Sequence, residues 1–171
     1  MADHITRYDK MPIPAIAAHT SYFDAGVIRI GVELRELTDE VVAAIRHTLQ
    51  GAGGDEPGQL EGLEDSGVSL HVYGRLDGID QEYLRFDCFL EDPHYHYVSW
   101  KNNTNEVLHI DPVADGDPLV WALDKISHRL VQMLVRAEAD EVAAKVDSRL
   151  LEDAMPQVAA AAYAARFQLQ G

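Results

Sequence analysis

The sequence predicts an α+β protein in which an antiparallel meander of about five strands packs against long α-helices. Short runs with alternating apolar and polar residues follow one another between residues 68 and 111, separated by turn residues. Helical patterns stand before and after these runs, beginning at Thr38 and at Asp117. Consecutive strands with short connections form antiparallel sheets, and helices grouped outside them along the chain cover one face of such a sheet.

The composition predicts one globular domain over residues 1–171 and excludes several partners. The chain has 14 basic and 29 acidic side chains, a net charge of −15, and 47% apolar residues. Phosphate neutralisation needs clustered Lys and Arg, so we expect no nucleic-acid partner and no binding to membranes. The single cysteine, Cys88, and the lack of an apolar run of the ~18 residues that a membrane span needs favour a cytoplasmic protein.

The first third of the chain is expected to contain an arm, a strand, a helix and a loop. Residues 1–20 include a Pro-Ile-Pro run whose missing amide donors favour an extended arm. The alternating stretch 26–34 predicts a strand. A helix is predicted to begin at Thr38, which is a suitable N-cap, and the Gly- and acid-rich residues 51–67 are predicted to form a mobile loop.

Four more strands and the C-terminal helices complete the predicted fold. The strands are expected at about 68–73, 83–90, 94–101 and 106–111. Turn residues separate them, at Asp77-Gly78, Asp92-Pro93 and Asn102-Asn103. Apolar residues at three- and four-residue steps predict helices over 117–171, with an interruption at Pro156. The Ala-rich stretch 159–165 is compatible with a homodimer contact and equally with core packing.

Matching the apolar residues of neighbouring strands places a polar set on one sheet face. His71 and Tyr73 alternate with apolar residues in one strand, and Arg85 and Asp87 do so in the next. A two-residue loop between these strands would give the opposite parity. Misplacing three apolar side chains costs several times about 1.5 kcal/mol, whereas a longer loop costs a few tenths. We therefore expect a longer loop, with these four polar side chains on a common face.

The next two connections decide which aromatic residues join this face. An even loop after residue 90 places His96 on the face of Asp87, whereas an odd loop places Tyr95 and Tyr97 there instead. Closing the last hairpin on the two asparagines at 102 and 103 pairs His96 with His109. We therefore predict two histidines side by side near one carboxylate.

This combination favours acid/base chemistry. A histidine beside a carboxylate suits general acid or base work, and Tyr or Arg can stabilise developing negative charge. No phosphate-binding loop, dinucleotide motif or nucleophile elbow is present. We predict a cofactor-independent lyase or isomerase, for example a carbon–carbon lyase, acting on a small aromatic or phenolic molecule. The expected catalytic residues are His71, Asp87, His96 and His109. The expected substrate-binding residues are Tyr73, Arg85, His94, Tyr95, Tyr97 and Trp100.

Two other functions stay open. His94 and His96 stand two residues apart on a predicted strand, and with His71, His109 or Asp87 they would form a three- or four-ligand site for Zn, Fe or Mn. That set predicts a metal-dependent enzyme. The other alternative is a non-catalytic ligand-binding or dimerisation module that uses the same aromatic face.

The segment LRFDCFLEDPHYHY, together with LHVYG upstream, resembles a small bacterial family that is characterised only as a domain of unknown function. The resemblance covers about residues 66–111. It implies that this segment is a characteristic feature of the chain, and it implies no residue roles.

Overall fold

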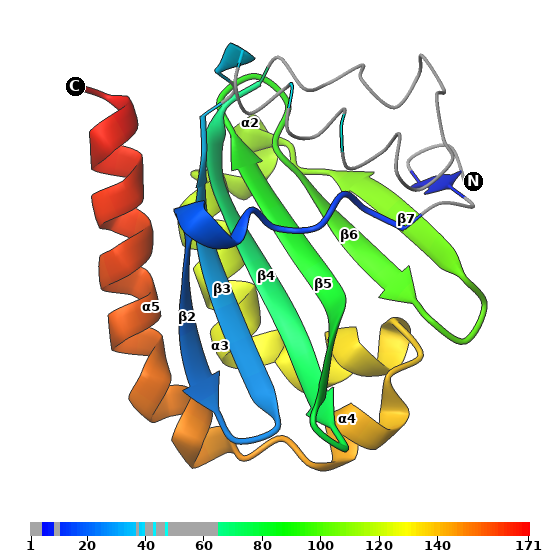
Figure 1. Ribbon diagram of the computed structural model, residues 1–171. Coiled ribbons are helices and arrows are strands. Elements are labelled where there is room, and N and C mark those ends of the chain that lie inside the picture. The colour runs from blue at the N-terminus through cyan, green and yellow to red at the C-terminus, as the bar shows by residue number, and fades with distance from the viewer. Residues whose placement is uncertain (1–4, 9–10, 37, 40–42, 44–46, 48–64) are drawn as a thin grey trace.

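The computed structural model describes residues 5–8, 11–36, 38–39, 43, 47 and 65–171. Within them, seven strands form one antiparallel sheet in the order β1-β7-β6-β5-β4-β3-β2 (Figure 1). The strands are β1 (Ile5–Tyr8), β2 (Thr20–Ala25), β3 (Ile28–Arg35), β4 (Gly67–Leu76), β5 (Ile79–Phe89), β6 (His94–Ser99) and β7 (Thr104–His109). The α+β class is confirmed, but the prediction of about five strands is wrong.

The two strands that the sequence did not predict lie at the edges of the sheet. β1 belongs to the stretch predicted as an arm, and it pairs with β7 from Ile5 opposite Leu108 onward. β2 forms a hairpin with β3, which starts at Ile28 because Gly26, at φ +67°, lies in the turn between them. Neither edge strand alternates cleanly in hydrophobicity, because each has a largely exposed burial pattern.

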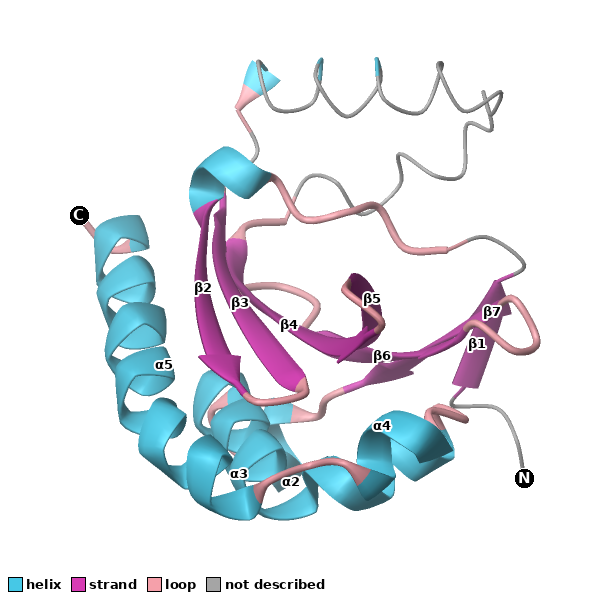
Figure 2. Ribbon diagram, turned by 60° about the horizontal axis from the view of Figure 1, so that its bottom comes forward, coloured by secondary structure: helices cyan, strands magenta, loops and turns pink. Residues whose placement is uncertain are grey.

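The helices cover one face of the sheet, and the segment that follows β1 crosses the other face (Figures 1 and 2). The helical elements are the 3-10 turn η1 (Ala17–His19), α2 (Pro112–Asp115), α3 (Pro118–Arg136), α4 (Asp140–Ala144) and α5 (Ser148–Leu169). Asp117 caps α3 as expected, accepting hydrogen bonds from Leu119 N and Val120 N. The predicted interruption at Pro156 is wrong: α5 is continuous through this residue, which lies on the exposed side of the helix.

Two predicted elements fall mainly outside the described residues: the helix expected from Thr38 and the loop expected over 51–67. None of the helices in the described ranges combines the length and apolar character of a membrane-spanning helix.

The hydrophobic core lies between the sheet and the helices. From the sheet it receives fully buried side chains such as Ile30, Leu70 and Phe86, and from α3 it receives Ile126 and Leu134. Cys88 also faces this side, with Sγ 3.5 Å from Pro118 O. Burial raises the pKa of its thiol, so Cys88 is a poor nucleophile.

A β-bulge sets the faces of the β4–β5 hairpin. Its turn has two residues, Asp77 and Gly78, both at positive φ, so the expected longer loop is wrong. Beyond the turn, Tyr83 is an extra residue between the pairs Val72–Leu84 and Tyr73–Glu82, and it shifts the register by one. The bulge therefore allows a two-residue turn while the apolar side chains of both strands stay buried on the helix side.

Candidate functional site

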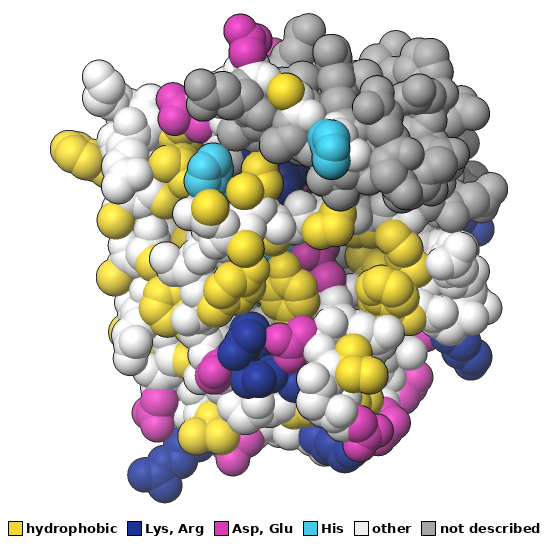
Figure 3. Space-filling model, viewed as in Figure 1, with side chains coloured by type: hydrophobic (Ala, Val, Ile, Leu, Met, Phe, Trp, Pro, Cys, Tyr) yellow, Lys and Arg dark blue, Asp and Glu magenta, His cyan; other side chains and the backbone are white. Residues whose placement is uncertain are grey.

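Charged side chains line the sheet face opposite the helices. They come from β3, β4 and β5, and each is less than 10% exposed: Glu33, Arg35, His71, Glu82, Arg85 and Asp87. Figure 3 shows charged side chains at the bottom of a recess on this face, surrounded by apolar ones. Buried charges are retained only where they are paired, and these alternate in sign along the sheet.

His71 is the centre of this charged lining. Its Nδ1 lies 2.7 Å from Glu82 Oε2 and its Nε2 lies 2.7 Å from Glu33 Oε2. Burial opposes a charged imidazolium, but the charge of Glu82 and the hydrogen bonds to both carboxylates outweigh it, so the pKa of His71 is raised. Arg35 pairs with Glu33 at 3.1 Å, and Arg85 pairs with Glu82 at 2.8 Å.

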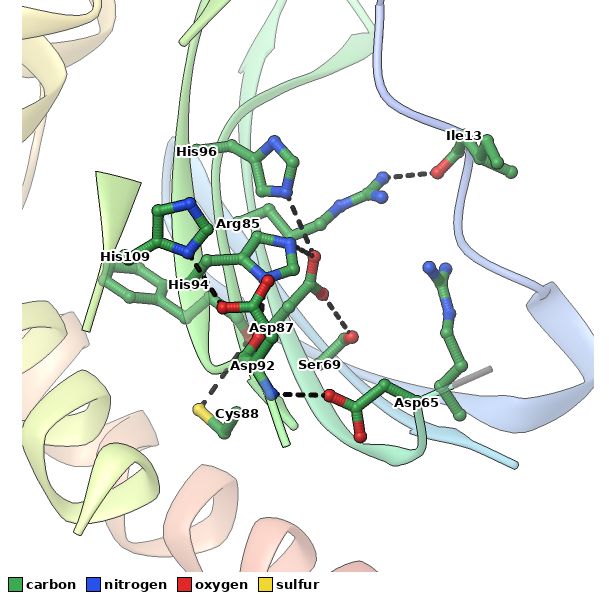
Figure 4. Close-up of polar contacts among 12 residues, drawn as sticks. Ile13, Asp65, Ser69, Arg85, Asp87, Cys88, Asp92, His94, His96 and His109 are labelled. Atoms are coloured by element: carbon green, nitrogen blue, oxygen red, sulfur yellow. Dashed lines mark hydrogen bonds and ion pairs between the residues drawn. The ribbon is translucent and has the colours of Figure 1, made fainter. Parts of the chain in front are cut away.

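The segment after β1 is fixed to this lining by main-chain hydrogen bonds. Arg85 Nη2 donates to Ile13 O at 2.5 Å (Figure 4). Ile16 N donates to Glu33 Oε1 at 3.4 Å. Residues 11–16, which belong to the stretch predicted as an extended arm, cross this face of the sheet (Figure 1). Their backbone therefore forms part of the wall around the charged lining.

Asp87 contacts two histidines of β6 on this face. Its Oδ2 lies 3.0 Å from His96 Nε2 and 3.2 Å from His94 Nε2, while its Oδ1 accepts a 2.5 Å hydrogen bond from Ser69 Oγ (Figure 4). One ligand atom from each of Asp87, His94 and His96 lies within 4.8 Å of the others. We call these three residues the Asp–His cluster.

In both histidines the outer ring nitrogen, Nδ1, which points away from Asp87, faces a carbonyl oxygen. His94 Nδ1 lies 2.8 Å from Asp92 O, and His96 Nδ1 lies 2.9 Å from Asn105 Oδ1. A carbonyl oxygen only accepts, so each Nδ1 carries the proton, and a neutral ring presents its Nε2 lone pair to Asp87. Three acceptor atoms then converge on one point, which requires either an added proton or a metal cation.

The pKa shifts in the cluster agree with this pattern of donors and acceptors. Burial alone would raise the pKa of Asp87, but hydrogen bonds from His94 and His96 hold it well below its usual range. Burial lowers the pKa of His94, yet its hydrogen bond to Asp87 prevails and the net shift is upward. His94 is the more accessible histidine, with 17% of its side chain exposed against 9% for His96.

The structure brings six of the predicted site residues onto one face: His71, Tyr73, Arg85, Asp87, His94 and His96. His71 pairs with Arg85 across the sheet, Tyr73 stacks near His71 at a centroid distance of 6.2 Å, and Asp87 contacts His96. These placements follow the predicted faces. His94, expected among the substrate-binding residues, lies on the same face, where it is opposite Asp87 in the β5–β6 ladder and contacts its carboxylate.

The predicted pairing of His96 with His109 is wrong. His109 pairs with His94, and His96 pairs with Val107, because the last hairpin has a four-residue connection instead of a two-residue turn. In that connection, the Trp100 indole reaches Glu82 O at 2.8 Å. The imidazole of His109 is mostly exposed and contacts Asp92 Oδ1 at 2.8 Å.

The expected aromatic walls lie elsewhere. Tyr95 and Tyr97 point to the helix side, where they pack against the core with Trp121. The even parity of the β5–β6 connection places His96 on the charged face, and it therefore excludes the two tyrosines from that face. Trp100 lies at the end of β6, 42% exposed.

Sequence reasoning missed the side chains that support the site. Glu33 occupies a polar position in the alternating pattern of the strand predicted over residues 26–34, so this alternation alone was enough to identify it. Glu82 reaches the charged face only through the bulge, and no local signal marks it. Asp65 accepts hydrogen bonds from Glu91 N and Asp92 N, and thereby fixes the turn that carries the carbonyl facing His94.

The fold and the site define an α+β protein with a buried carboxylate–histidine cluster on the sheet face opposite the helices. The model of a family described as Domain of unknown function (DUF7700) matches residues 22–162, and the chain belongs to this family. The resemblance to an uncharacterised domain family is thus confirmed, over a longer range than the one that suggested it. No curated protein and no solved structure gives a significant match.

Proposed function

We propose that the protein is a metal-dependent enzyme that binds one divalent transition metal ion, Zn, Fe or Mn, through Asp87, His94 and His96. The observation that carries this proposal is the convergence of three acceptor atoms whose outer nitrogens are already held by carbonyl oxygens. Two histidines and one carboxylate are the ligand set of many mononuclear metal enzymes with open coordination positions.

The spacing of the ligand atoms supports the same function. Ligands at about 2.1 Å from a metal lie about 3.0 Å apart at adjacent octahedral positions and about 3.4 Å apart in a tetrahedron. Asp87 Oδ2 lies 3.0 Å from His96 Nε2, which equals the octahedral value. It lies 3.2 Å from His94 Nε2, which is between the octahedral and the tetrahedral values. The carboxylate therefore already stands at a distance from each imidazole that is typical of two ligands of one metal ion.

The surrounding residues have distinct roles in this proposal. Ser69 holds one oxygen of Asp87 and leaves the other for the metal, and Asn105 with Asp92 O orients the two imidazoles. A bound metal acts as a Lewis acid and lowers the pKa of coordinated water. The buried guanidinium of Arg85, on the same face, adds positive charge near Asp87 and helps to keep the pKa of this carboxyl low.

A second candidate is the cofactor-independent acid/base enzyme, of lyase or isomerase type, with His94 in place of His109. The specific observation is the raised pKa of the partly exposed His94, which would serve as a general acid held by Asp87. For both candidates we propose a small organic substrate and a cytoplasmic location, consistent with the free Cys88.

Metal titration separates the two candidates. The purified chain is stripped with chelator, reloaded with Zn, Fe(II) or Mn under anaerobic conditions, desalted and analysed for bound metal, and Co(II) is added separately to record its ligand-field spectrum. We expect about one equivalent in the wild-type chain, and less than a tenth of an equivalent in Asp87→Asn and His96→Gln. The matched control is His128→Gln, since His128 is exposed on α3.

The outcomes are distinct. Less than a tenth of an equivalent of each metal in the folded wild-type chain would refute the metal site and leave the acid/base candidate. Equal loading of His96→Gln and wild type would show that the metal binds elsewhere. Circular dichroism of each variant confirms that the fold is retained.

A further inference from the structure

A second hollow lies on the opposite side of the sheet from the Asp–His cluster. It is formed between β6 and α3, which lies behind the sheet in Figure 1, and it measures about 250 Å³. Aromatic side chains of both elements line it, followed by cationic and polar side chains along α3: Tyr95, Tyr97, Trp121, Lys125, Arg129 and Gln132. The metal site proposed above uses none of these residues.

Three aromatic rings form the wall of this hollow. The ring of Tyr95 lies 5.1 Å from that of Trp121 and 5.6 Å from that of Tyr97, between centroids. All three side chains are half-buried, so each keeps part of its surface accessible. Aromatic walls of this kind bind flat rings through stacking and apolar contact.

The polar atoms of these rings are all able to donate a hydrogen bond. Among the described residues, no hydrogen bond involves the hydroxyls of Tyr95 and Tyr97 or the indole nitrogen of Trp121. Burial raises the pKa of Tyr95 to about 12, so its hydroxyl keeps its proton at neutral pH. All three side chains are half-exposed, so these donors are available to a ligand rich in acceptors.

Positive charge borders the same hollow in a chain with a net charge of −15. Lys125 lies over the ring of Trp121 at 5.4 Å and pairs with Asp124, and Arg136 lies over the ring of Tyr97 at 4.6 Å and pairs with Glu106. Within the described part of the chain, Arg129 forms no ion pair, although acidic side chains outnumber basic ones by 29 to 14. Arg129 is exposed at the edge of the hollow, so its guanidinium is available to an anionic ligand that enters the hollow.

We propose that this hollow is a binding site for a small planar organic anion, namely an aromatic carboxylate of one or two rings. The ring of the ligand stacks on the aromatic wall, and its carboxylate accepts hydrogen bonds from Arg129 and the tyrosine hydroxyls. The volume sets the size class, because pockets for drug-sized ligands measure about 300–1,000 Å³ and this hollow is slightly smaller.

Calorimetric titration of the full chain with naphthalene-2-carboxylate tests the proposal. We expect saturable 1:1 binding, with naphthalene-2-carboxamide, the neutral analogue of similar shape, binding at least tenfold more weakly. Arg129→Gln should raise the Kd about tenfold through the loss of a charge-assisted hydrogen bond. Tyr95→Phe should raise it several-fold through the loss of a neutral one.

Two control variants make the test specific. Arg149→Gln removes an exposed arginine of α5 that also has no ion pair within the described residues, and it should leave the Kd within twofold. Asp87→Asn should also leave the Kd unchanged, because Asp87 lies on the other sheet face. Absence of binding, equal binding of the amide, or equal effects of the two arginine variants would overturn the proposal, as would loss of binding in Asp87→Asn.

Discussion

Replacing His71 with glutamine removes the cation that bridges two buried carboxylates. Glu33 and Glu82 each lie 2.7 Å from one ring nitrogen, and a glutamine carries no charge and can donate to only one of them from its amide. Removing one partner of a buried ion pair costs about 3–5 kcal/mol. Each carboxylate keeps an arginine, Arg35 or Arg85, so we expect the lower end, about 3 kcal/mol, or a loss of roughly 6–12 °C in the thermal midpoint.

The same variant should change how stability depends on pH. The pKa of His71 is raised in the folded chain, so its contribution is complete below about pH 6.5 and is lost as the pH rises through the folded value. The pKa values of Glu33 and Glu82 are lowered, so their contribution is present above about pH 4.3 and is lost as the pH falls through their folded values. The wild-type midpoint should therefore decline above pH 6.5, and His71→Gln should show a shallower decline.

Differential scanning calorimetry from pH 5.5 to pH 9, with His128→Gln as the control, measures both effects. His128 is exposed and, within the described ranges, forms hydrogen bonds only with Asp124 of its own helix, so its replacement should shift the midpoint by less than about 2 °C. A midpoint of His71→Gln within 2 °C of wild type at pH 6, or a wild-type midpoint that rises between pH 6.5 and 8.5, would refute the reasoning.

Three further predictions concern the metal ligands, the core and the cysteine. Asn105→Leu should weaken metal binding 10- to 100-fold, because it removes the carbonyl that orients His96; unchanged affinity in a metal titration would contradict this. Gly74→Ala should destabilise the chain by about 1–3 kcal/mol in urea unfolding, because its Cβ would lie 2.6 Å from Val142 Cγ2; a neutral effect would show that α4 moves aside easily. Cys88 should react with a thiol reagent at least tenfold more slowly in the native chain than in urea, and equal rates would contradict its burial.

Hydrophobic alternation predicted the faces of the central strands because burial dominates the energetics there. The choice of burial over turn type placed His71, Arg85 and Asp87 on one face, and the structure agrees. The premise that only a longer loop could satisfy burial was wrong. A bulge leaves one residue, Tyr83, without a partner on the neighbouring strand. A prediction from strict two-residue alternation does not allow for such an extra residue.

The sequence predicted which residue types form the candidate site, but it did not predict which of these residues lie opposite one another in the sheet. Pairing of β6 with β7 depends on a turn whose length is set by tertiary contacts of Ser99 and Asn102 with Glu138 in the loop after α3. Such long-range contacts leave no local pattern, so His109 was assigned to the wrong neighbour. The edge strands were missed for a similar reason, because a half-exposed edge needs no strict alternation.

Because Tyr83 is an extra residue in the bulge, the charged side chains face the same partners whether or not the chain contains it. Deleting this single residue would leave a regular ladder in which Tyr73 still faces Glu82 and His71 still faces Arg85, with the same two-residue turn. The loss would fall on the other side of the sheet, where the ring packs close to Gly74. A one-residue gap at this point in an alignment of related chains would therefore be compatible with an intact charged lining.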